Sequence, residues 1–360
     1  MPRIDSFLRL VVEQRASDLH FTAGSVPLIR HHGELVPLPF RVLSEAEARK
    51  FLAEMLTAEE RDKLETEQEL DLLYSLPGVG RFRANVFVQN NGWGAAFRII
   101  PDSPPNLEDL GFPWSVGGLC ALQNGLVLIG GPTGSGKTTT LAAIVNEINK
   151  TARKHIVTIE DPIEFLHEPV LSAITQRQVG AHIDSFAEAL RSALRESPDV
   201  LVVGEMRDAE TLNLAVQAAE TGVLVFGTLH TSSAAKTLTR AVDMALEENR
   251  EQLRSSLSVL LKGVIAQHLL RRSGGEGRIA AVEVLLNNPA VASMIRDNKV
   301  PQIDSYLQSI SLDSGMQGLE GCLSRYVRDG LIDLEEACRL STAPEVLKKE
   351  AQSLMLQDSA

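Results

Sequence analysis

Residues 131–138 read Gly-Pro-Thr-Gly-Ser-Gly-Lys-Thr and match the phosphate-loop pattern G-x-x-x-x-G-K-[ST] at every position. The glycines of this pattern let the backbone wrap so that its N–H groups point at phosphate oxygens, and the helix that follows adds the positive end of its dipole. We expect Lys137 to reach the β- and γ-phosphates of ATP and the Thr138 hydroxyl to ligate Mg²⁺. The residues expected to bind the nucleotide are Gly131, Pro132, Thr133, Gly134, Ser135, Gly136, Lys137, Thr138 and Thr139.

ATP hydrolysis also needs a second anchor for magnesium, a group that orients or deprotonates the attacking water, and positive charge in the transition state. Glu205 follows the apolar residues 200–203, where a Walker B carboxylate belongs. A Gly-Glu pair stands there instead of the more usual terminal Asp, so we expect Glu205 both to anchor the metal through water and to activate water. The alternative interpretation is a strand-end carboxylate that caps the next helix.

An acidic cluster, Glu160, Asp161 and Glu164, follows the apolar residues 156–159. Because Pro162 fixes the turn, we expect Glu164 to be aimed at the γ-phosphate as the general base. We expect Glu160 and Asp161 to be magnesium ligands or structural partners. A solvated turn is the alternative interpretation for each of these carboxylates.

His230 directly follows another apolar run, residues 223–227. As a γ-phosphate sensor it could donate a hydrogen bond that is lost after hydrolysis, and this loss could move the strand. The alternative is a polar residue that is satisfied at a strand end and has no part in sensing.

Several arginines could supply the positive charge of the transition state. Arg81, Arg83 and Arg98 lie on one face of a predicted hairpin with no local partner, which normally means a solvated surface. In a ring of subunits this face could act in trans as an arginine finger. Arg191 and Arg195 are rival candidates on a predicted helix. Glu188 lies three residues before Arg191, so the alternative interpretation of Arg191 is a surface ion pair with Glu188.

The motif-bearing runs alternate with helical segments between residues 106 and 270, which is typical of a parallel α/β sheet. Ligands bind at the carboxyl ends of strands in such sheets, so we expect the motifs to meet at one edge. Beyond about residue 235 the pattern becomes helical. Its apolar stripe comprises Leu253, Leu257, Leu260, Leu261, Val264 and Ile265. Residues 273–277 predict a loop, and a final helical block extends to about Gln352.

Residues 1–100 predict a small α+β domain, with an amphipathic helix at the start, strands at 17–21 and 28–30, a strongly helical segment at 44–67 and a hairpin over 81–100. The proline-rich residues 101–105 break secondary structure and mark the linker. The predicted divisions are an N-terminal domain at 1–100, a linker at 101–106, an ATPase core at 107–270 and a mainly helical C-terminal region at 271–360.

Composition limits the class of protein. The chain has 360 residues, enough for two or three domains, and a net charge of −12, which argues against a surface built to neutralise nucleic acid. The three cysteines, Cys120, Cys322 and Cys338, form no C-x-x-C pair, so we expect reduced thiols and no zinc ribbon. No run of 18 apolar residues and no signal-peptide pattern is present, so we expect a soluble cytoplasmic protein.

Four motifs in fixed order resemble those of the type II/IV secretion ATPases, and most of all the PilT-type pilus retraction motors. GPTGSGKT (131–138) resembles their Walker A motif, TIEDPIEF (158–165) their Asp box, VGEMRD (203–208) their Walker B motif and GTLHT (227–231) their His box. Residues 17–20, 80–83, 189–196 and 218–222 extend the resemblance, which covers the chain to about residue 330.

This resemblance implies a homohexameric ring in which an N-terminal PAS-like domain and a RecA-like domain clamp ATP and Mg²⁺. It makes Glu164 and Glu205 the acidic catalytic pair, His230 the His-box residue, and Arg83 and Arg98 arginine contacts across a domain or subunit junction. The work implied is pilus disassembly for twitching motility, through the inner-membrane platform protein and indirectly pilin, by a cytoplasmic protein peripheral to that membrane. The chain carries neither the longer N-terminal region nor the tetracysteine element of assembly and secretion motors, which favours retraction.

Other functions stay open at this point. The retraction family carries Ala-Ile-Arg-Asn-Leu-Ile-Arg-Glu where this chain has Ala-Val-Ala-Ser-Met-Ile-Arg-Asp at 290–297, which suits an accessory retraction motor. A nucleic-acid translocase could share the RecA-like core, although the acidic charge and the lack of aromatics among basic residues disfavour it. A regulatory nucleotide-binding subunit is a third alternative, against which Lys137, Glu164 and Glu205 argue.

Overall fold

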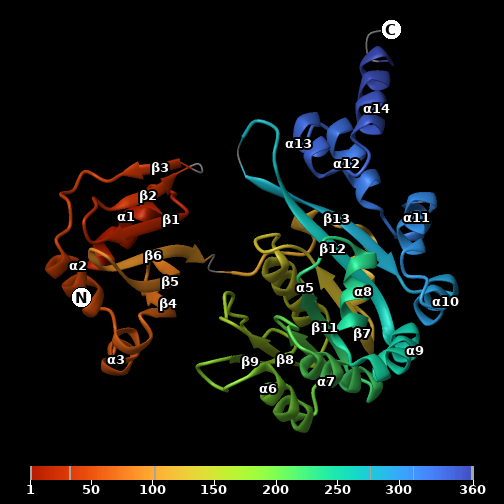
Figure 1. Ribbon diagram of the computed structural model, residues 1–360, viewed down its shortest axis with the longest axis horizontal. Helices are drawn as coiled ribbons and strands as arrows, with labels where there is room; N and C mark the ends of the chain where they lie inside the picture. Colours follow the sequence, from red (N-terminus) through yellow and green to blue (C-terminus); the bar gives the residue numbers. More distant parts are fainter. Residues whose placement is uncertain (1, 32–33, 101–102, 276, 311, 358–360) are drawn as a thin grey trace. The chain divides into compact units, whose positions relative to one another are not determined.

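The computed structural model describes residues 2–31, 34–100, 103–275, 277–310 and 312–357. Its internal contacts divide the chain into two compact units (Figure 1). The first unit comprises Met1–Ser103 together with the short segment Pro162–Leu166, and the second comprises Pro104–Asp161 and His167–Ala360.

The first unit is a six-stranded antiparallel sheet in the order β3-β2-β1-β6-β5-β4. Its strands are β1 (Asp18–Thr22), β2 (Leu28–His31), β3 (Glu34–Pro37), β4 (Glu69–Leu76), β5 (Gly80–Gln89) and β6 (Gly92–Ile100). Its helices are α1 (Ile4–Glu13), α2 (Glu45–Ala53) and α3 (Ala58–Glu67). Fully buried Phe21, Phe82 and Phe97 join apolar residues of all three helices in one core.

The strongly helical segment expected over residues 44–67 comprises two helices. Ser44 caps α2 and Thr57 caps α3, each in a full capping box with the glutamate three residues later, Glu47 and Glu60. The second box starts a new helix, and the Thr-x-x-Glu pattern in the sequence was the signal for it.

The second unit is built on a seven-stranded sheet in the order β13-β12-β7-β11-β10-β8-β9. Its strands are β7 (Gly125–Gly130), β8 (His155–Glu160), β9 (Ala173–Gln178), β10 (Val200–Val203), β11 (Leu224–Leu229), β12 (Leu261–Arg271) and β13 (Arg278–Leu286). All neighbours are parallel except β12 and β13, which form an antiparallel hairpin.

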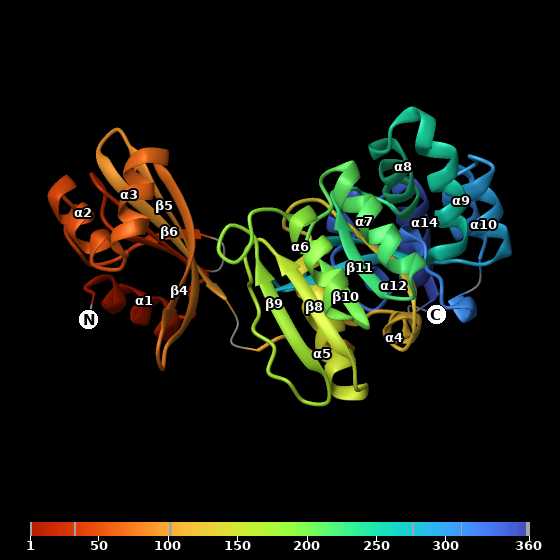
Figure 2. The same ribbon diagram turned by 90° about the horizontal axis from the view of Figure 1, so that it is seen from below.

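Helices cover both faces of this sheet, with α4 and α5 on one side and α6 to α9 on the other (Figure 2). The α-helices are α4 (Trp114–Cys120), α5 (Lys137–Thr151), α6 (Phe186–Ala193), α7 (Ala209–Glu220), α8 (Ala234–Met244), α9 (Arg250–Leu260), α10 (Pro289–Arg296), α11 (Gln302–Ser309), α12 (Leu319–Arg328), α13 (Leu334–Leu340) and α14 (Pro344–Gln357). Short 3-10 helices are η1 (Glu108–Leu110), η2 (Leu194–Glu196), η3 (Glu247–Asn249) and η4 (Leu312–Ser314).

Burial on both faces explains the continuous apolar run of β7. Leu126 and Leu128 belong to the core under α6 to α9, while Val127 and Ile129 belong to the core under α4 and α5. The α/β class with an N-terminal α+β domain, predicted from such runs, is confirmed.

The prediction of one helical stripe beyond residue 235 is wrong from Leu261 onward. Helix α9 ends at Leu260, and β12 begins at the next residue and pairs with β7. Val264 and Ile265, placed on one helical face by their spacing, are adjacent strand residues that point into opposite cores. The expectation of a mainly helical region from residue 271 also missed β13, which extends this sheet to Leu286.

Two further expectations concern cysteines and membranes. Cys120 and Cys322 are buried, Cys338 is partly buried, and all three are free thiols. Within the described residues, none of the helices has the length and apolar character needed to cross a membrane.

Candidate functional site

The phosphate loop connects β7 to α5 in the second unit. Gly134 and Gly136 adopt φ values of +75° and +91°, which L side chains rarely adopt, and Gly136 immediately precedes the helix. A Cβ atom on Gly131 would lie 2.2 Å from the Ser135 hydroxyl oxygen, so the loop closes tightly on itself. That hydroxyl is buried and has no hydrogen-bond partner. These features fit a loop that presents its backbone and Ser135 to phosphate oxygens.

Lys137 opens helix α5 with its ammonium group turned back over the loop. Its Nζ donates to the carbonyl oxygens of Gly131 at 2.7 Å and Pro132 at 3.0 Å, and lies 3.3 Å from His230 Nδ1. Burial lowers the pKa of the Lys137 ammonium, and the charge of Glu205 opposes this shift.

Glu205 lies at the end of β10 with both carboxylate oxygens engaged. Oε1 is 2.9 Å from His230 Nε2, and Oε2 is 2.7 Å from an Arg207 guanidinium nitrogen. Burial raises the pKa of the Glu205 carboxyl, but the hydrogen bond and charge of Arg207, together with the charge of Lys137, outweigh it, so the pKa is lowered. The side chain is 19 % exposed and ionised, as a metal anchor or proton acceptor requires.

The strand ends bring Glu205 and His230 together. Strands β10 and β11 pair in register up to Val203 and Gly227. Beyond that pair, the Met206 N–H donates to the Thr228 carbonyl oxygen at 3.0 Å, and the Thr228 hydroxyl donates to the Gly204 carbonyl oxygen. A Cβ on Gly227 would lie 2.6 Å from the Met206 side chain, so the glycine permits this close approach. Lys137, Glu205 and His230 therefore meet, as expected for residues at one sheet edge.

The acidic cluster divides between the two units. Glu160, at the end of β8, accepts hydrogen bonds from the Thr158 hydroxyl at 2.6 Å and the Gln176 amide at 3.1 Å. Asp161 is exposed. The pKa of Arg207 is raised mainly by its hydrogen bond with Glu205, and the charge of Asp161 contributes to this rise. Glu164 belongs to the first unit. The structure thus gives Glu160 structural partners, and its role as a magnesium ligand stays a prediction.

In the first unit, two of the candidate arginines, Arg83 and Arg98, have ion-pair partners that are distant in the sequence. Arg83 and Arg98 are directly opposite each other on β5 and β6. Arg83 lies 3.6 Å from the Glu164 carboxylate and 3.9 Å from Asp71, and Arg98 donates to Asp18 at 2.8 Å. These pairs were missed because their members are far apart in the sequence. Both arginines keep substantial exposure, 42 % for Arg83 and 72 % for Arg98, and stay available to a second partner.

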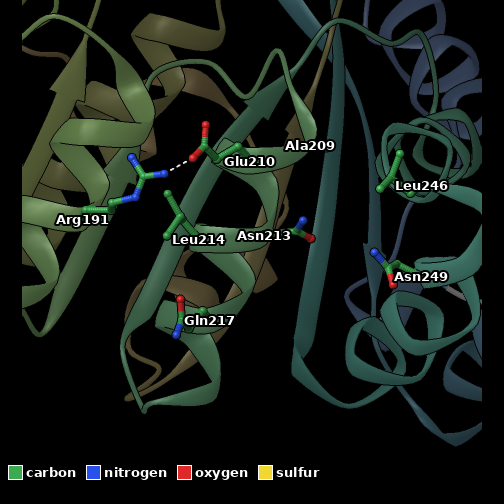
Figure 3. Close-up of a pocket in the computed structure, with 8 residues that line it drawn as sticks. All are labelled: Arg191, Ala209, Glu210, Asn213, Leu214, Gln217, Leu246 and Asn249. Carbon is green, nitrogen blue, oxygen red and sulfur yellow. Dashed lines mark hydrogen bonds and ion pairs between the residues drawn. The ribbon is translucent and has the colours of Figure 1, made fainter.

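The rival arginines lie on and beside α6. Arg191 forms an ion pair with Glu210 on α7, not with Glu188, across a hollow of about 370 Å³ also lined by Leu214 and Leu246 (Figure 3). Arg195 lies in η2. The Arg191 pair is a contact between two helices, and this hollow contains none of the motif residues.

Sequence reasoning missed the part played by Arg207. It stands two residues after Glu205 in the stretch VGEMRD, and this proximity of an arginine to a Walker B carboxylate was the signal for it. Within the described residues, no group of three or more His, Cys, Asp or Glu side chains could hold a metal by itself. A magnesium ion here would also need oxygen ligands other than carboxylates, such as the Thr138 hydroxyl, phosphate oxygens and water.

Comparisons with known proteins show the family to which the chain belongs. The type II/IV secretion system protein family matches residues 2–281. The chain is 45% identical over 342 residues to the type IV pilus retraction ATPase PilT of Pseudomonas aeruginosa, covering 95% of this chain and 99% of that protein. It is also 45% identical to a twitching motility protein of Neisseria gonorrhoeae, covering 94% and 89%.

A crystal structure of the pilus retraction motor PilT with bound ADP has the same fold. It superposes with a TM-score of 0.87 at 43% sequence identity, covering 96% of this chain and 98% of that one. The chain is therefore similar over nearly its whole length to a protein that binds ADP, which supports nucleotide binding. With its phosphate loop and its linked Lys137, His230 and Glu205, the chain is a P-loop ATPase and belongs to the type II/IV secretion system protein family, among the PilT-type ATPases.

Proposed function

We propose that this ATPase is a homohexameric motor that couples ATP hydrolysis to the disassembly of a type IV pilus, and so drives twitching motility. The observation that carries the proposal is the contact chain from Lys137 through His230 to Glu205, which links the phosphate loop to the ends of two other strands. The identity of 45% to a retraction ATPase over nearly the whole of both chains supports the same work.

Each step of the chemistry is assigned to particular residues in this proposal. The phosphate-loop N–H groups and Lys137 bind the phosphates. Thr138 would hold Mg²⁺, with Glu205 as its water-mediated anchor and Glu160 as a further ligand, and a bound ion would supply positive charge against the triphosphate. Glu205 Oε1 or the Glu164 carboxylate accepts the proton of the attacking water.

His230 reports on the phosphates in this proposal. An ammonium group has no acceptor, so the Lys137 contact requires an unprotonated His230 Nδ1, and the single ring proton lies on Nε2, where it is donated to Glu205. When Lys137 turns to the β- and γ-phosphates, Nδ1 loses this partner. His230 then responds to nucleotide while still held by Glu205.

Arg83 and Arg98 supply the positive charge of the transition state to a site on a neighbouring subunit. Their shared face on β5 and β6, with substantial exposure, supports this role. A motor of this kind works at the cytoplasmic side of the inner membrane, against the platform protein at the pilus base, and through it on pilin. It needs no nucleic acid, and the net charge of −12 suits that.

The test of the hexameric motor is the ATPase activity of the purified chain at increasing concentration, with size-exclusion chromatography alongside. Specific activity should rise as the hexamer forms, because part of the site comes from a neighbouring subunit. Constant activity from a monomer would contradict a site completed between subunits.

An accessory retraction motor is the second candidate function, and α10 favours it. Asn288 caps this helix, and Val291 and Ile295 are fully buried, so the segment keeps its fold. Ala292, however, stands at the partly exposed position where the resemblance leads us to expect arginine.

Expression in a strain that lacks its main retraction motor distinguishes a main motor from an accessory one. Restored twitching supports a main motor, and failure with normal ATPase activity supports the accessory role.

A further inference from the structure

A buried glutamine of β12, outside all four motifs, donates a hydrogen bond to the phosphate loop. Gln267 is 1% exposed, and most of the other residues in its strand are apolar. Its Nε2 donates to the Ser135 carbonyl oxygen at 2.7 Å, and its Oε1 accepts from the Thr140 hydroxyl at 2.8 Å. The amide thus connects the loop to the first turn of α5.

Strand pairing fixes the place of this amide. Strand β12 is parallel to β7, and Ala266 pairs with Gly130, the last residue before the loop. Gln267, the next residue, therefore lies beside the loop at the point where it leaves the sheet. A one-residue shift in the pairing would turn its side chain to the other face.

The loop packs directly on Gln267. A Cβ on Gly131 would lie 2.9 Å from the Gln267 carbonyl oxygen, and a Cβ on Gly136 would lie 3.2 Å from its Nε2. Two glycines of the loop thus contact the backbone and side chain of the same residue. A displaced amide at this position would move the loop or leave buried polar groups unsatisfied, which costs free energy.

We propose that Gln267 is a positioning residue that holds the phosphate loop and the start of α5 in their nucleotide-binding shape. It does so by joining Ser135 to Thr140 through one buried side chain and touches no nucleotide itself. This inference rests on the nucleotide site of the ATPase, and pilus retraction plays no part in it.

The test compares Gln267→Met with Gln317→Met, because methionine keeps the length of the side chain without its hydrogen bonds. Gln317 is a matched control. It is 2% exposed, and its amide donates at 2.8 Å to the carbonyl oxygen of Val282, the residue that pairs with Gln267 across the hairpin. It contacts neither the phosphate loop nor α5 through any hydrogen bond in the described part of the chain.

Both variants should lower the melting temperature, because each leaves buried backbone or hydroxyl groups without a partner. Only Gln267→Met should weaken ADP binding in calorimetry, by about tenfold, which is about 1.4 kcal/mol and the size of one buried hydrogen bond. It should also raise the KM for ATP, while Gln317→Met stays within about twofold of the wild type.

Unchanged ADP affinity in Gln267→Met would overturn the proposal, as would equal losses in both variants. If Gln267→Met does not fold, Thr140→Val and Thr140→Ser replace it: the serine keeps the hydroxyl donor and should bind ADP normally, and the valine should bind it several-fold more weakly. Normal binding by Thr140→Val would equally contradict the role. Failure of the wild type to bind ADP would instead refute the nucleotide site.

Discussion

The Nε2 atom of His230 lies 2.9 Å from Oε1 of Glu205, so the His-box residue and the Walker B carboxylate are directly joined. The contact is possible because β10 and β11 end side by side and Gly227 lets Met206 approach. Through Nδ1, the same ring faces Lys137 at 3.3 Å. The carboxylate at the end of β10 and the lysine of the phosphate loop are thus connected through one side chain.

Replacing Glu205 by Gln should lower the turnover number by about 100-fold or more, the usual contribution of a general base, while ADP affinity changes little. The amide keeps the shape of the side chain but can neither accept a proton nor balance Arg207. Steady-state ATPase assays and calorimetry with ADP measure the two effects. Glu164→Gln should behave in the same way, and full turnover in either variant would remove that residue from the catalytic role.

Removing the positive charge of Arg207 should shift the pH profile of ATP hydrolysis. Burial raises the pKa of Glu205, and Arg207 is the largest of the opposing effects, so in Arg207→Ala the pKa of Glu205 should rise. The acidic limb of the kcat/KM profile should then move to higher pH. Arg191→Ala is the control, since Arg191 pairs with Glu210 away from the site. If the acidic limb of the kcat/KM profile stays at the same pH in Arg207→Ala, protonation of Glu205 does not determine that limb.

Glu283 should make the protein less stable as the pH rises. It is 8% exposed, accepts the Ala234 N–H at 2.6 Å, and burial raises its pKa from 4.5 to about 7. Between these values the folded protein holds a proton that the unfolded chain has released, so the free energy of unfolding falls as pH rises through this window.

The loss attributable to Glu283 is up to about 3 kcal/mol between pH 4.5 and pH 7. Glu283→Gln keeps an acceptor for Ala234 without titrating, so its melting temperature should decline less over this range than that of the wild type. Parallel curves for the two proteins would show that Glu283 does not carry this pH dependence.

Mixing inactive variants tests whether Arg83 acts across subunits. Arg83→Ala and Glu205→Gln should each be nearly inactive, but their mixed hexamers should contain some sites with both residues intact. Activity of the mixture above that of either parent is the expected result. Arg83→Ala also breaks the pair with Glu164, so Glu164→Ala mixed with Glu205→Gln is the control for that loss. A mixture as inactive as its parents would place both groups in the same site.

Much of the site could be predicted because local patterns determine it. The apolar run of β7 and the complete phosphate-loop pattern specify a strand, a loop and a helix, and the carboxyl ends of parallel strands must meet. Glu205 and His230 followed from that rule. Helical spacing from Leu253 onward continued by chance into β12, where only pairing with β7 decides the structure.

Contacts between residues far apart in the chain could not be predicted from the sequence. The partners of Arg83 and Arg98 lie on other strands or on a distant segment. Gln267 lies in a mostly apolar strand, and nothing near it in the chain indicates that it contacts Ser135, 132 positions away. Such residues are identified only when the register of the sheet is known.

Deleting the gene for this chain in its natural host, then counting surface pili and measuring twitching, tests the central claim most directly. A retraction motor predicts that twitching is lost while pili remain and accumulate, and that the wild-type gene, but not Glu205→Gln, reverses both changes. Loss of the pili themselves would indicate an assembly motor and contradict the account, as would normal twitching with a normal number of pili.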